Sequence, residues 1–253
     1  MSTRSTNKIK KILTAHQPGT VVLPKWLGDQ GISRDLQKRY VKSGWLKPIG
    51  TGAYVVNNEK VTWKGALYAV QKHLLLPVHV GASTALDLQG QAHYLKTGEV
   101  RVFLFSPMKT SLPGWFVRYP WRSDIVHKKT SMLPPNAGLS QVPEQGFNIT
   151  VSAPERAILE CLYLAPDEMD LAECYDLLGG LSNLRPKLLQ QLLEKCNSIK
   201  VKRLFLHLSH KAGHRWVDYL NEAMLNLGTG DRGIVKGGTY VSKYRITVPK
   251  ELA

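Results

Sequence analysis

The sequence predicts an α+β fold in which an N-terminal winged helix-turn-helix domain is followed by a larger mixed α+β domain. Three observations support this prediction. A short helix, a glycine turn, a second and basic helix, and a hairpin follow one another without spacers between residues 24 and 56. The positive charge is concentrated in the same part of the chain. From about residue 99 onward, stretches typical of strands are followed by stretches with apolar residues at helical spacing.

The charge distribution points to a polyanionic partner. The chain of 253 residues has 34 Lys and Arg against 19 Asp and Glu, which gives a formal net charge of +15 at pH 7. Residues 1–64 hold 12 of the basic residues and 3 of the acidic ones, so +9 of the charge lies there and +6 in the rest. We therefore expect the first quarter of the chain to bind nucleic acid.

Other features exclude several classes of protein. No apolar run approaches the roughly 18 residues that a membrane-spanning helix needs, and the polar N-terminus does not read as a secretory signal. The cysteines Cys161, Cys174 and Cys196 are odd in number and show no C-x-x-C spacing. This argues against a disulfide framework and a zinc site, and predicts buried thiols in a cytoplasmic protein.

The first elements are predicted from apolar spacing and turn residues. Isoleucine and leucine at helical spacing predict a helix over residues 7–15. The β-branched stretch at residues 20–23 is predicted to be a short strand that pairs with the hairpin. A second helix begins at Pro24, where the missing N–H costs nothing, and it buries Trp26 and Leu27.

A glycine turn and a third helix complete the DNA-reading motif. Gly31 supplies the turn, and Ser33 is a natural N-cap for a helix that extends to about residue 43. Leu36 and Tyr40, spaced i, i+4, form the buried face of this helix. Residues 46–56 alternate around a three-residue tip that contains two glycines, which predicts the hairpin of the wing.

The third helix carries the candidate base-reading residues. Arg34, Gln37 and Lys38 share a face away from the apolar one, where arginine suits a guanine edge and glutamine an adenine edge. The outlying lysines are better placed for phosphates, and the tip of the hairpin is expected in the minor groove or on the backbone. The alternative is that this is the solvated face of a structural helix. The predicted DNA-binding residues are Lys8, Lys11, Lys25, Ser33, Arg34, Gln37, Lys38, Arg39, Lys42, Lys47 and Thr51.

The rest of the chain predicts the α+β domain. The simplest division gives domains over residues 1–92 and 93–253, with a boundary anywhere from about 75 to 98. Ser152-Ala-Pro-Glu155 has the pattern of a capping box that opens a helix. The other predicted elements are helices over 62–75, 83–88, 171–178, 186–196 and 198–211, and strands over 100–105, 115–121 and 239–248.

The helix over residues 198–211 carries a second group of basic residues. Lys200, Arg203, His207 and Lys211 fall on one face, opposite the apolar one. The functional interpretation is a second polyanion or partner face, which histidine would make weakly pH-sensitive. The alternative is an ordinary solvated face.

No pattern indicates catalysis. None of the 19 acidic residues stands in an acid-x-Lys pair of the kind that metal-dependent nucleases use. The glycine-rich residues 228–233 lack the lysine-serine/threonine ending and the following helix of a phosphate-binding loop, so a surface turn is predicted. The eight histidines show no metal-binding spacing. We expect a protein that is not an enzyme, with neither cofactor nor metal.

The sequence resembles the AbiEi family, the antitoxins of bacterial type IV toxin–antitoxin systems. The similarity covers nearly the whole chain and thins between about residues 106 and 147. It is carried by Gly19-Thr-Val-Val-Leu-Pro-Lys-Trp-Leu27, Gly31-Ile-Ser-Arg-Asp-Leu-Gln37, Tyr40-Val-Lys-Ser-Gly-Trp-Leu46, Gly50-Thr-Gly-Ala-Tyr54, Gly65-Ala-Leu-Tyr-Ala69, Pro77-Val-His-Val-Gly81, Thr84-Ala-Leu-Asp-Leu-Gln-Gly90, Ser152-Ala-Pro-Glu-Arg-Ala157, Val201-Lys-Arg-Leu-Phe-Leu206 and Ile234-Val-Lys-Gly-Gly238.

The resemblance implies two roles. The winged helix would repress the operon of antitoxin and toxin by binding inverted repeats in promoter DNA, with two copies on the operator. The C-terminal domain would counteract a nucleotidyltransferase-like toxin without a stable complex, as part of phage defence in the bacterial cytoplasm, close to the nucleoid. No catalytic residues of the family transfer to this chain. The alternative is a stand-alone regulator whose C-terminal domain binds a ligand or a partner protein.

Overall fold

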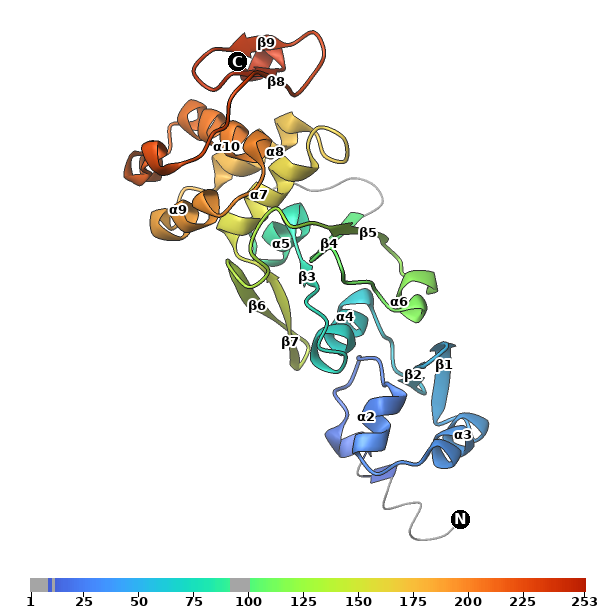
Figure 1. Ribbon diagram of the computed structural model, residues 1–253. Coiled ribbons are helices and arrows are strands. Elements are labelled where there is room, and N and C mark those ends of the chain that lie inside the picture. The colour runs from blue at the N-terminus through green and yellow to red at the C-terminus, as the bar shows by residue number, and fades with distance from the viewer. Residues whose placement is uncertain (1–8, 11, 92–100) are drawn as a thin grey trace. The chain divides into compact units, whose positions relative to one another are not determined.

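The computed structural model describes residues 9, 10, 12–91 and 101–253 (Figure 1). Contacts between Cα atoms divide the chain into two compact units. Unit 1 comprises residues 1–78, 109–125 and 141–150, and unit 2 comprises residues 79–108, 126–140 and 151–253. The chain thus returns twice to unit 1 after first leaving it.

Unit 1 contains the predicted helix-turn-helix and hairpin. Its elements are α2 (Pro24–Asp29), α3 (Arg34–Lys42), β1 (Leu46–Gly50), β2 (Ala53–Val56), α4 (Trp63–Lys72) and α6 (Gly114–Arg118). The described residues between 9 and 15 are helical, as predicted, while Asn7, Lys8 and Lys11 of that predicted helix lie outside the described part. One apolar cluster holds α2, α3 and the hairpin together, and it consists of Ile12, Val22, Leu27, Ile32, Leu36, Tyr40, Leu46 and Val56.

The hairpin is antiparallel and irregular near its tip. Leu46 pairs with Val56 at its base, and the register shifts between Pro48 and Gly50. Pro48 has no backbone N–H to donate to the neighbouring strand, so the irregularity lies where strand pairing is already weaker. Val22 forms an isolated antiparallel bridge with Tyr54, which confirms that residues 20–23 pair with the hairpin.

The segment predicted as a strand over residues 115–121 is wrong, because it contains helix α6. Pro113 precedes this helix in the extended conformation that residues at an N-cap adopt. Trp115 and Phe116 are both buried. Residues 114–118 therefore form a short helix with buried aromatic side chains in place of the predicted strand.

Unit 2 contains most of a five-stranded sheet in the order β5-β4-β3-β7-β6. At its centre β3 (His79–Val80) runs antiparallel to β4 (Arg101–Ser106) and parallel to β7 (Phe147–Ser152). The flanking strands are β5 (Asp124–Lys129) and β6 (Leu139–Glu144). The interior of β4 is buried from Val102 to Ser106, which explains its few polar positions.

The helices of unit 2 surround α7 (Pro154–Leu164), whose residues are buried on nearly every side. It packs against α5 (Ala82–Leu88), α8 (Leu171–Gly180), α9 (Pro186–Glu194) and α10 (Ile199–Ala212). The predicted helices at these places are confirmed. No described helix is long and apolar enough to cross a membrane. All three cysteines are buried thiols, as predicted.

The predicted capping box at the start of α7 is wrong in its contacts. The N-cap is Ala153, and no side chain caps the helix. The Ser152 hydroxyl instead donates to the Glu160 carboxylate, 2.7 Å away. Glu155 accepts from the backbone and the guanidinium of Arg185. Both polar side chains of the predicted motif are thus engaged in tertiary hydrogen bonds rather than in closing the first turn.

The end of the chain forms a small three-stranded sheet and not one closing strand. Its order is β8 (Arg232–Gly233), β10 (Ile246–Val248), β9 (Thr239–Val241), with β10 parallel to β8 and antiparallel to β9. The chain turns at Arg245, whose φ of 53° breaks the strand predicted over residues 239–248. Short 3-10 helices lie at Arg215–Tyr219, Glu222–Met224 and Lys250–Leu252.

Candidate nucleic-acid interface

The angle between α2 and α3 is set by a glycine turn. Gly31 has a φ of +79°, a conformation that residues with a Cβ rarely adopt. Its N–H donates to the carbonyl of Gly28 at 2.8 Å, and the N–H of Ile32 donates to that of Leu27 at 2.9 Å. The side chain of Ile32 is buried between the two helices. These contacts give the helix-turn-helix that the sequence predicts.

Helix α3 is capped and amphipathic. The Ser33 hydroxyl accepts from the N–H of Leu36 at 3.4 Å, which confirms Ser33 as the N-cap. Asp35 lies in the first turn, and Arg39 and Lys42 lie in the last turn. Each of these charges is at the end of the helix where its interaction with the helix dipole is favourable. Leu36 and Tyr40 are buried as predicted. One face of α3 therefore packs against the rest of unit 1, and the opposite face is exposed to solvent.

Most of the predicted DNA-binding side chains are exposed to solvent. Lys38 lies 4.0 Å from Asp35, but both side chains are more than four-fifths exposed, so this pair neutralises little of the surface charge. Lys8 and Lys11 lie outside the described residues. The predicted residues that are exposed are Lys25, Ser33, Arg34, Lys38, Arg39, Lys42, Lys47 and Thr51.

An acidic residue of this region is turned away from the basic face. Glu59 accepts from the N–H of Gly19 at 2.9 Å and contacts the buried His16 ring at 3.0 Å. The Glu59 carboxylate is therefore engaged by Gly19 and His16 within the protein. The exposed surface of the helix-turn-helix is more basic than the count of its acids implies.

Gln37 does not lie on the exposed face, and this corrects its assignment to base reading. It is 4% exposed. Its amide nitrogen donates to the carbonyl of Pro24 at 3.2 Å and to that of Ile32 at 3.0 Å. Gln37 thus ties α3 to the start of α2 and to the turn. Its role is to hold the motif together, because both amide hydrogens are used inside the protein.

Replacing Gln37 with leucine is expected to lower the free energy of unfolding by about 1–3 kcal/mol, because the carbonyls of Pro24 and Ile32 lose the donor that Gln37 supplies. Chemical denaturation measures this. The neighbouring exposed substitution K38L serves as the control and should stay within about 0.5 kcal/mol of the wild type. An unchanged stability of Q37L, together with a changed base preference, would contradict the structural role and restore the base-reading one.

The predicted second basic face on α10 is also corrected, chiefly by Arg203. This side chain is 2% exposed. Its guanidinium donates to the carbonyls of Leu227 at 2.7 Å, Gly228 at 3.0 Å, Gly230 at 2.7 Å and Arg245 at 3.1 Å. All these acceptors belong to the C-terminal part of the chain. Arg203 is therefore an anchor for that segment and is not available to a polyanion.

The other members of this face also contact the protein itself. The His207 ring lies 2.6 Å from the carbonyl of Leu252, and burial lowers its pKa. The neutral ring is therefore favoured at pH 7, so His207 adds no positive charge to this face. Lys200 donates to the carbonyls of Tyr163 and Ala165, and Lys211 donates to that of Ala253 at 2.9 Å. The three cations of the predicted face, Lys200, Arg203 and Lys211, thus donate to main-chain carbonyls.

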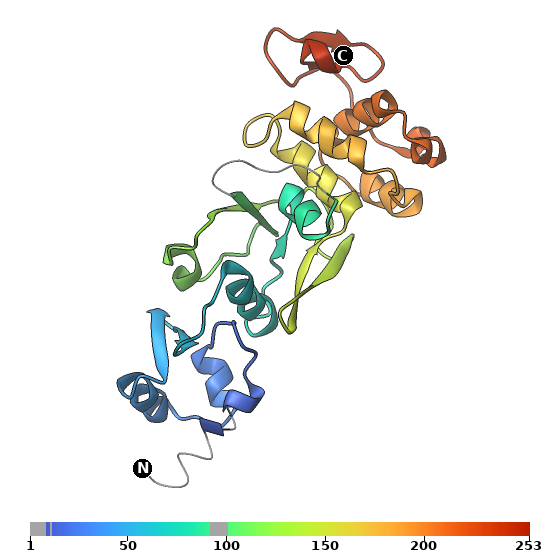
Figure 2. The ribbon, with the colours of Figure 1, turned by 180° about the vertical axis from the view of Figure 1, so that it is seen from behind.

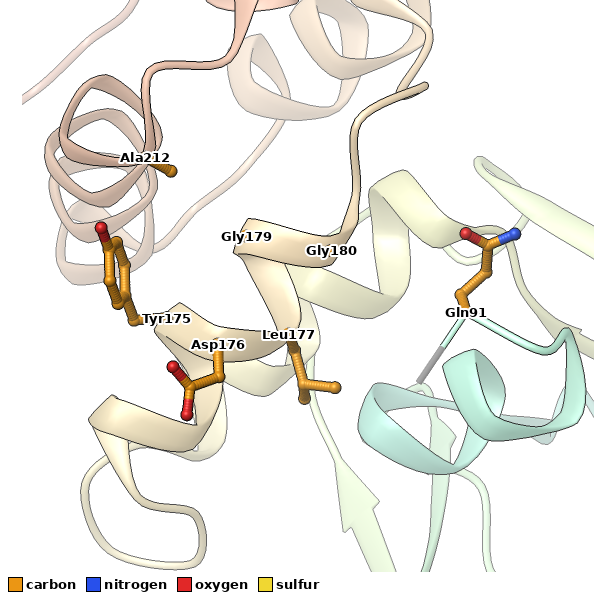
Figure 3. Close-up of a pocket in the computed structure, with 7 residues that line it drawn as sticks. All are labelled: Gln91, Tyr175, Asp176, Leu177, Gly179, Gly180 and Ala212. Carbon is orange, nitrogen blue, oxygen red and sulfur yellow. The ribbon is translucent and has the colours of Figure 1, made fainter. Parts of the chain in front are cut away.

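A surface cavity of about 330 Å³ lies elsewhere in unit 2 (Figure 3). It is bordered by the last turn of α8, where two glycines leave the backbone uncovered, and by the end of α10. Asp176 is its single charged group. The cavity contains none of the predicted site residues, and no described group of three or more His, Cys, Asp or Glu side chains is suited to hold a metal. Its lining residues are Gln91, Tyr175, Asp176, Leu177, Gly179, Gly180 and Ala212.

Comparison with known proteins covers both halves of the chain. A family model described as "Transcriptional regulator, AbiEi antitoxin N-terminal domain" matches residues 5–97. A second, described as "Transcriptional regulator, AbiEi antitoxin, Type IV TA system", matches residues 99–249. No curated protein matches the chain.

Among solved structures, the chain is similar to the crystal structure of the RV2827C protein from Mycobacterium tuberculosis. The TM-score is 0.59 at 14% sequence identity, over 97% of this chain and 92% of that one. At this identity the similarity establishes the fold and nothing finer. The two family matches together span nearly the whole sequence. The chain therefore belongs to the AbiEi family of transcriptional regulators, the antitoxins of type IV toxin–antitoxin systems.

Proposed function

We propose that this AbiEi antitoxin represses its own operon by inserting α3 into the major groove of inverted-repeat promoter DNA. The observation that carries the proposal is the row of cations on the exposed face of a capped recognition helix. Arg34, Lys38 and Arg39 are exposed at its start and middle, where a helix-turn-helix contacts base edges. Lys25 and Lys47 flank the helix and suit phosphates.

With Gln37 removed from the reading face, Arg34 and Lys38 become the best candidates for base contacts. They are one turn apart and both exposed, so they reach the same groove. An arginine near the start of a recognition helix suits the O6 and N7 atoms of guanine. The proposed operator half-site therefore includes at least one guanine that Arg34 reads.

The experiment that tests this proposal is a mobility shift on the DNA upstream of the protein's own gene. The wild type should bind with a strong salt dependence, and the double charge reversal R34E/K38E should abolish binding. The control K187E/K195E makes the same change in charge on exposed residues at α9 and should bind like the wild type. Undiminished binding by R34E/K38E would overturn the assignment of α3.

We further propose that the chain counteracts a nucleotidyltransferase-like toxin through its C-terminal domain, without a stable complex, and that two copies occupy the operator. A truncation at residue 93 would test this poorly, because residues 109–125 and 141–150 pack within unit 1. The full-length R34E/K38E variant is the better reagent. Expressed from an independent promoter beside the toxin, it should rescue growth. If only DNA-binding protein rescues, repression carries the effect.

A further inference from the structure

Helix α6 belongs to the same compact unit as the helix-turn-helix, although more than fifty residues separate it from the hairpin in sequence. It packs directly on strand β1. A Cβ atom placed on Gly50 would lie 2.8 Å from the Cβ of Trp115 and 3.1 Å from its Cα. The two backbones meet where only glycine leaves room. Gly50 also has a φ of +154°, which a residue with a side chain rarely adopts.

The segment that follows α6 is braced by aromatic contacts. The indole N–H of Trp121 donates to the carbonyl of Phe116 at 2.7 Å. The rings of Tyr119 and Trp121 lie 4.4 Å apart between centroids, and those of Phe116 and Trp121 lie 5.6 Å apart. Trp115 and Phe116 are both buried. The turn from α6 to residue 122 thus has a defined shape next to the wing.

This braced turn presents positive charge to the solvent. Lys109, Arg118 and Arg122 are exposed, and within the described residues none of the three forms an ion pair. Asp124 is the only acid between residues 109 and 125. Exposed cations without acidic partners favour binding to a phosphate backbone.

We propose that α6 and the turn to residue 122 form a second wing, which continues the DNA-binding surface beyond the hairpin and contacts phosphates through Arg118 and Arg122. In both views α3, the β1–β2 hairpin and α6 follow one another along the same side of unit 1 (Figures 1 and 2). A duplex bound at α3 and the hairpin tip extends naturally toward α6. The inference rests on the proposed function of α3.

The salt dependence of binding tests this second wing. Each phosphate contact contributes about 0.9 to the slope of log affinity against log salt, so R118A/R122A should lower the slope by about 1.8. The same term predicts an affinity about tenfold or more weaker at about 0.1 M salt. The probe is the duplex upstream of the protein's own gene, and a random-sequence duplex of equal length should lose affinity in parallel, because phosphate contacts carry no sequence information.

The outcomes separate this inference from the function on which it rests. The control K187A/K195A removes two exposed lysines at α9 and should leave the slope unchanged. If the wild type binds and R34E/K38E does not, but R118A/R122A keeps the wild-type affinity and slope, the second wing is wrong and the repressor role stands. If the wild type binds no DNA, the proposed function itself fails.

A glycine pair tests the packing that positions the second wing. G50A brings a Cβ against Trp115, whereas G52A changes another tip glycine of positive φ, +80°, that has open space around it. Both variants strain the backbone, but only G50A displaces α6. We expect G50A to weaken DNA binding several-fold more than G52A at equal folded fraction. Equal losses in the two variants would show that α6 does not matter for binding.

Discussion

The substitution E160Q is expected to lower the free energy of unfolding by about 3–5 kcal/mol, because it removes a fully buried charge from its partners. The Glu160 carboxylate lies 2.9 Å from the His79 ring and accepts from Arg156 Nε at 2.7 Å and from the Ser152 hydroxyl at 2.7 Å. It also accepts from the N–H of Ala82 at 3.1 Å. A glutamine amide places two N–H donors where the protein already presents donors.

The location of this network explains the size of the effect. Its members come from β3, α5, β7 and α7, so the carboxylate ties the central strands of the sheet to the central helix. A Cβ on Gly81 would lie 2.3 Å from the Glu160 carboxylate, so the backbone approaches the charge as closely as glycine allows.

The same network predicts a pH dependence. Burial alone would raise the pKa of Glu160, but the charges and hydrogen bonds of His79, Arg156 and Ser152 lower it below the ordinary value of 4.5. A depressed carboxyl pKa stabilises the fold above the unfolded value, and this stabilisation is lost as the pH falls through the folded one. The wild type should therefore lose more stability below about pH 4.5 than E160Q does.

Denaturant titrations at pH 7 and at acidic pH measure both effects. The exposed substitution E194Q on α9 makes the same chemical change outside the core and should leave the midpoint nearly unchanged. Equal midpoints for E160Q and the wild type at pH 7, or parallel losses of stability on acidification, would show that the network does not stabilise the fold.

The substitution R203A is the second change with a large expected effect, again about 3–5 kcal/mol. The guanidinium satisfies four main-chain carbonyls between residues 227 and 245 and is itself buried. Alanine would remove this donor from the carbonyls of Leu227, Gly228 and Gly230 and leave a cavity beneath them, while the Arg245 carbonyl would keep the N–H of Arg232. We expect R203K to be intermediate, since an ammonium cannot reproduce the fork of a guanidinium.

Local protection distinguishes anchoring from a general loss of stability. Hydrogen exchange in R203A should rise first over residues 227–253, and limited proteolysis should begin there. The control R232A removes an exposed arginine from the same segment and should change neither readout. If exchange rises uniformly along the chain, or if R203A matches R232A, Arg203 does not anchor the C-terminal segment.

The helix-turn-helix was predictable because its signals are local. Apolar spacing, the glycine of the turn and the serine cap lie within a few residues of the structure that they determine. The burial of Gln37 was not predictable in this way. It occupies a polar position on α3, and what removes it from the surface is the pair of carbonyls of Pro24 and Ile32 from the preceding helix and turn.

The errors elsewhere share a cause, which is contacts over long distances in sequence. Arg203 lies on the polar side of its helix, and its acceptors follow 24 to 42 residues later. A strand is predicted over residues 115–121, but the segment begins with a helix that packs against Gly50. The spacing of apolar residues reports only local structure, so it cannot predict a contact with a residue far along the chain. The exposed cations Arg118 and Arg122 were missed for the same reason.

The packing of α6 on the hairpin also limits which related sequences can recombine into a folded protein. The two family matches meet at residues 97 and 99, which invites the idea of two modules that recombine freely. A crossover there would join the glycine-bearing hairpin of one parent to the tryptophan-bearing helix of another. Gly50 and Trp115 leave less than a methyl group of space between them. A viable hybrid must therefore inherit matching partners on both sides of the join, so the two halves are bound to diverge together.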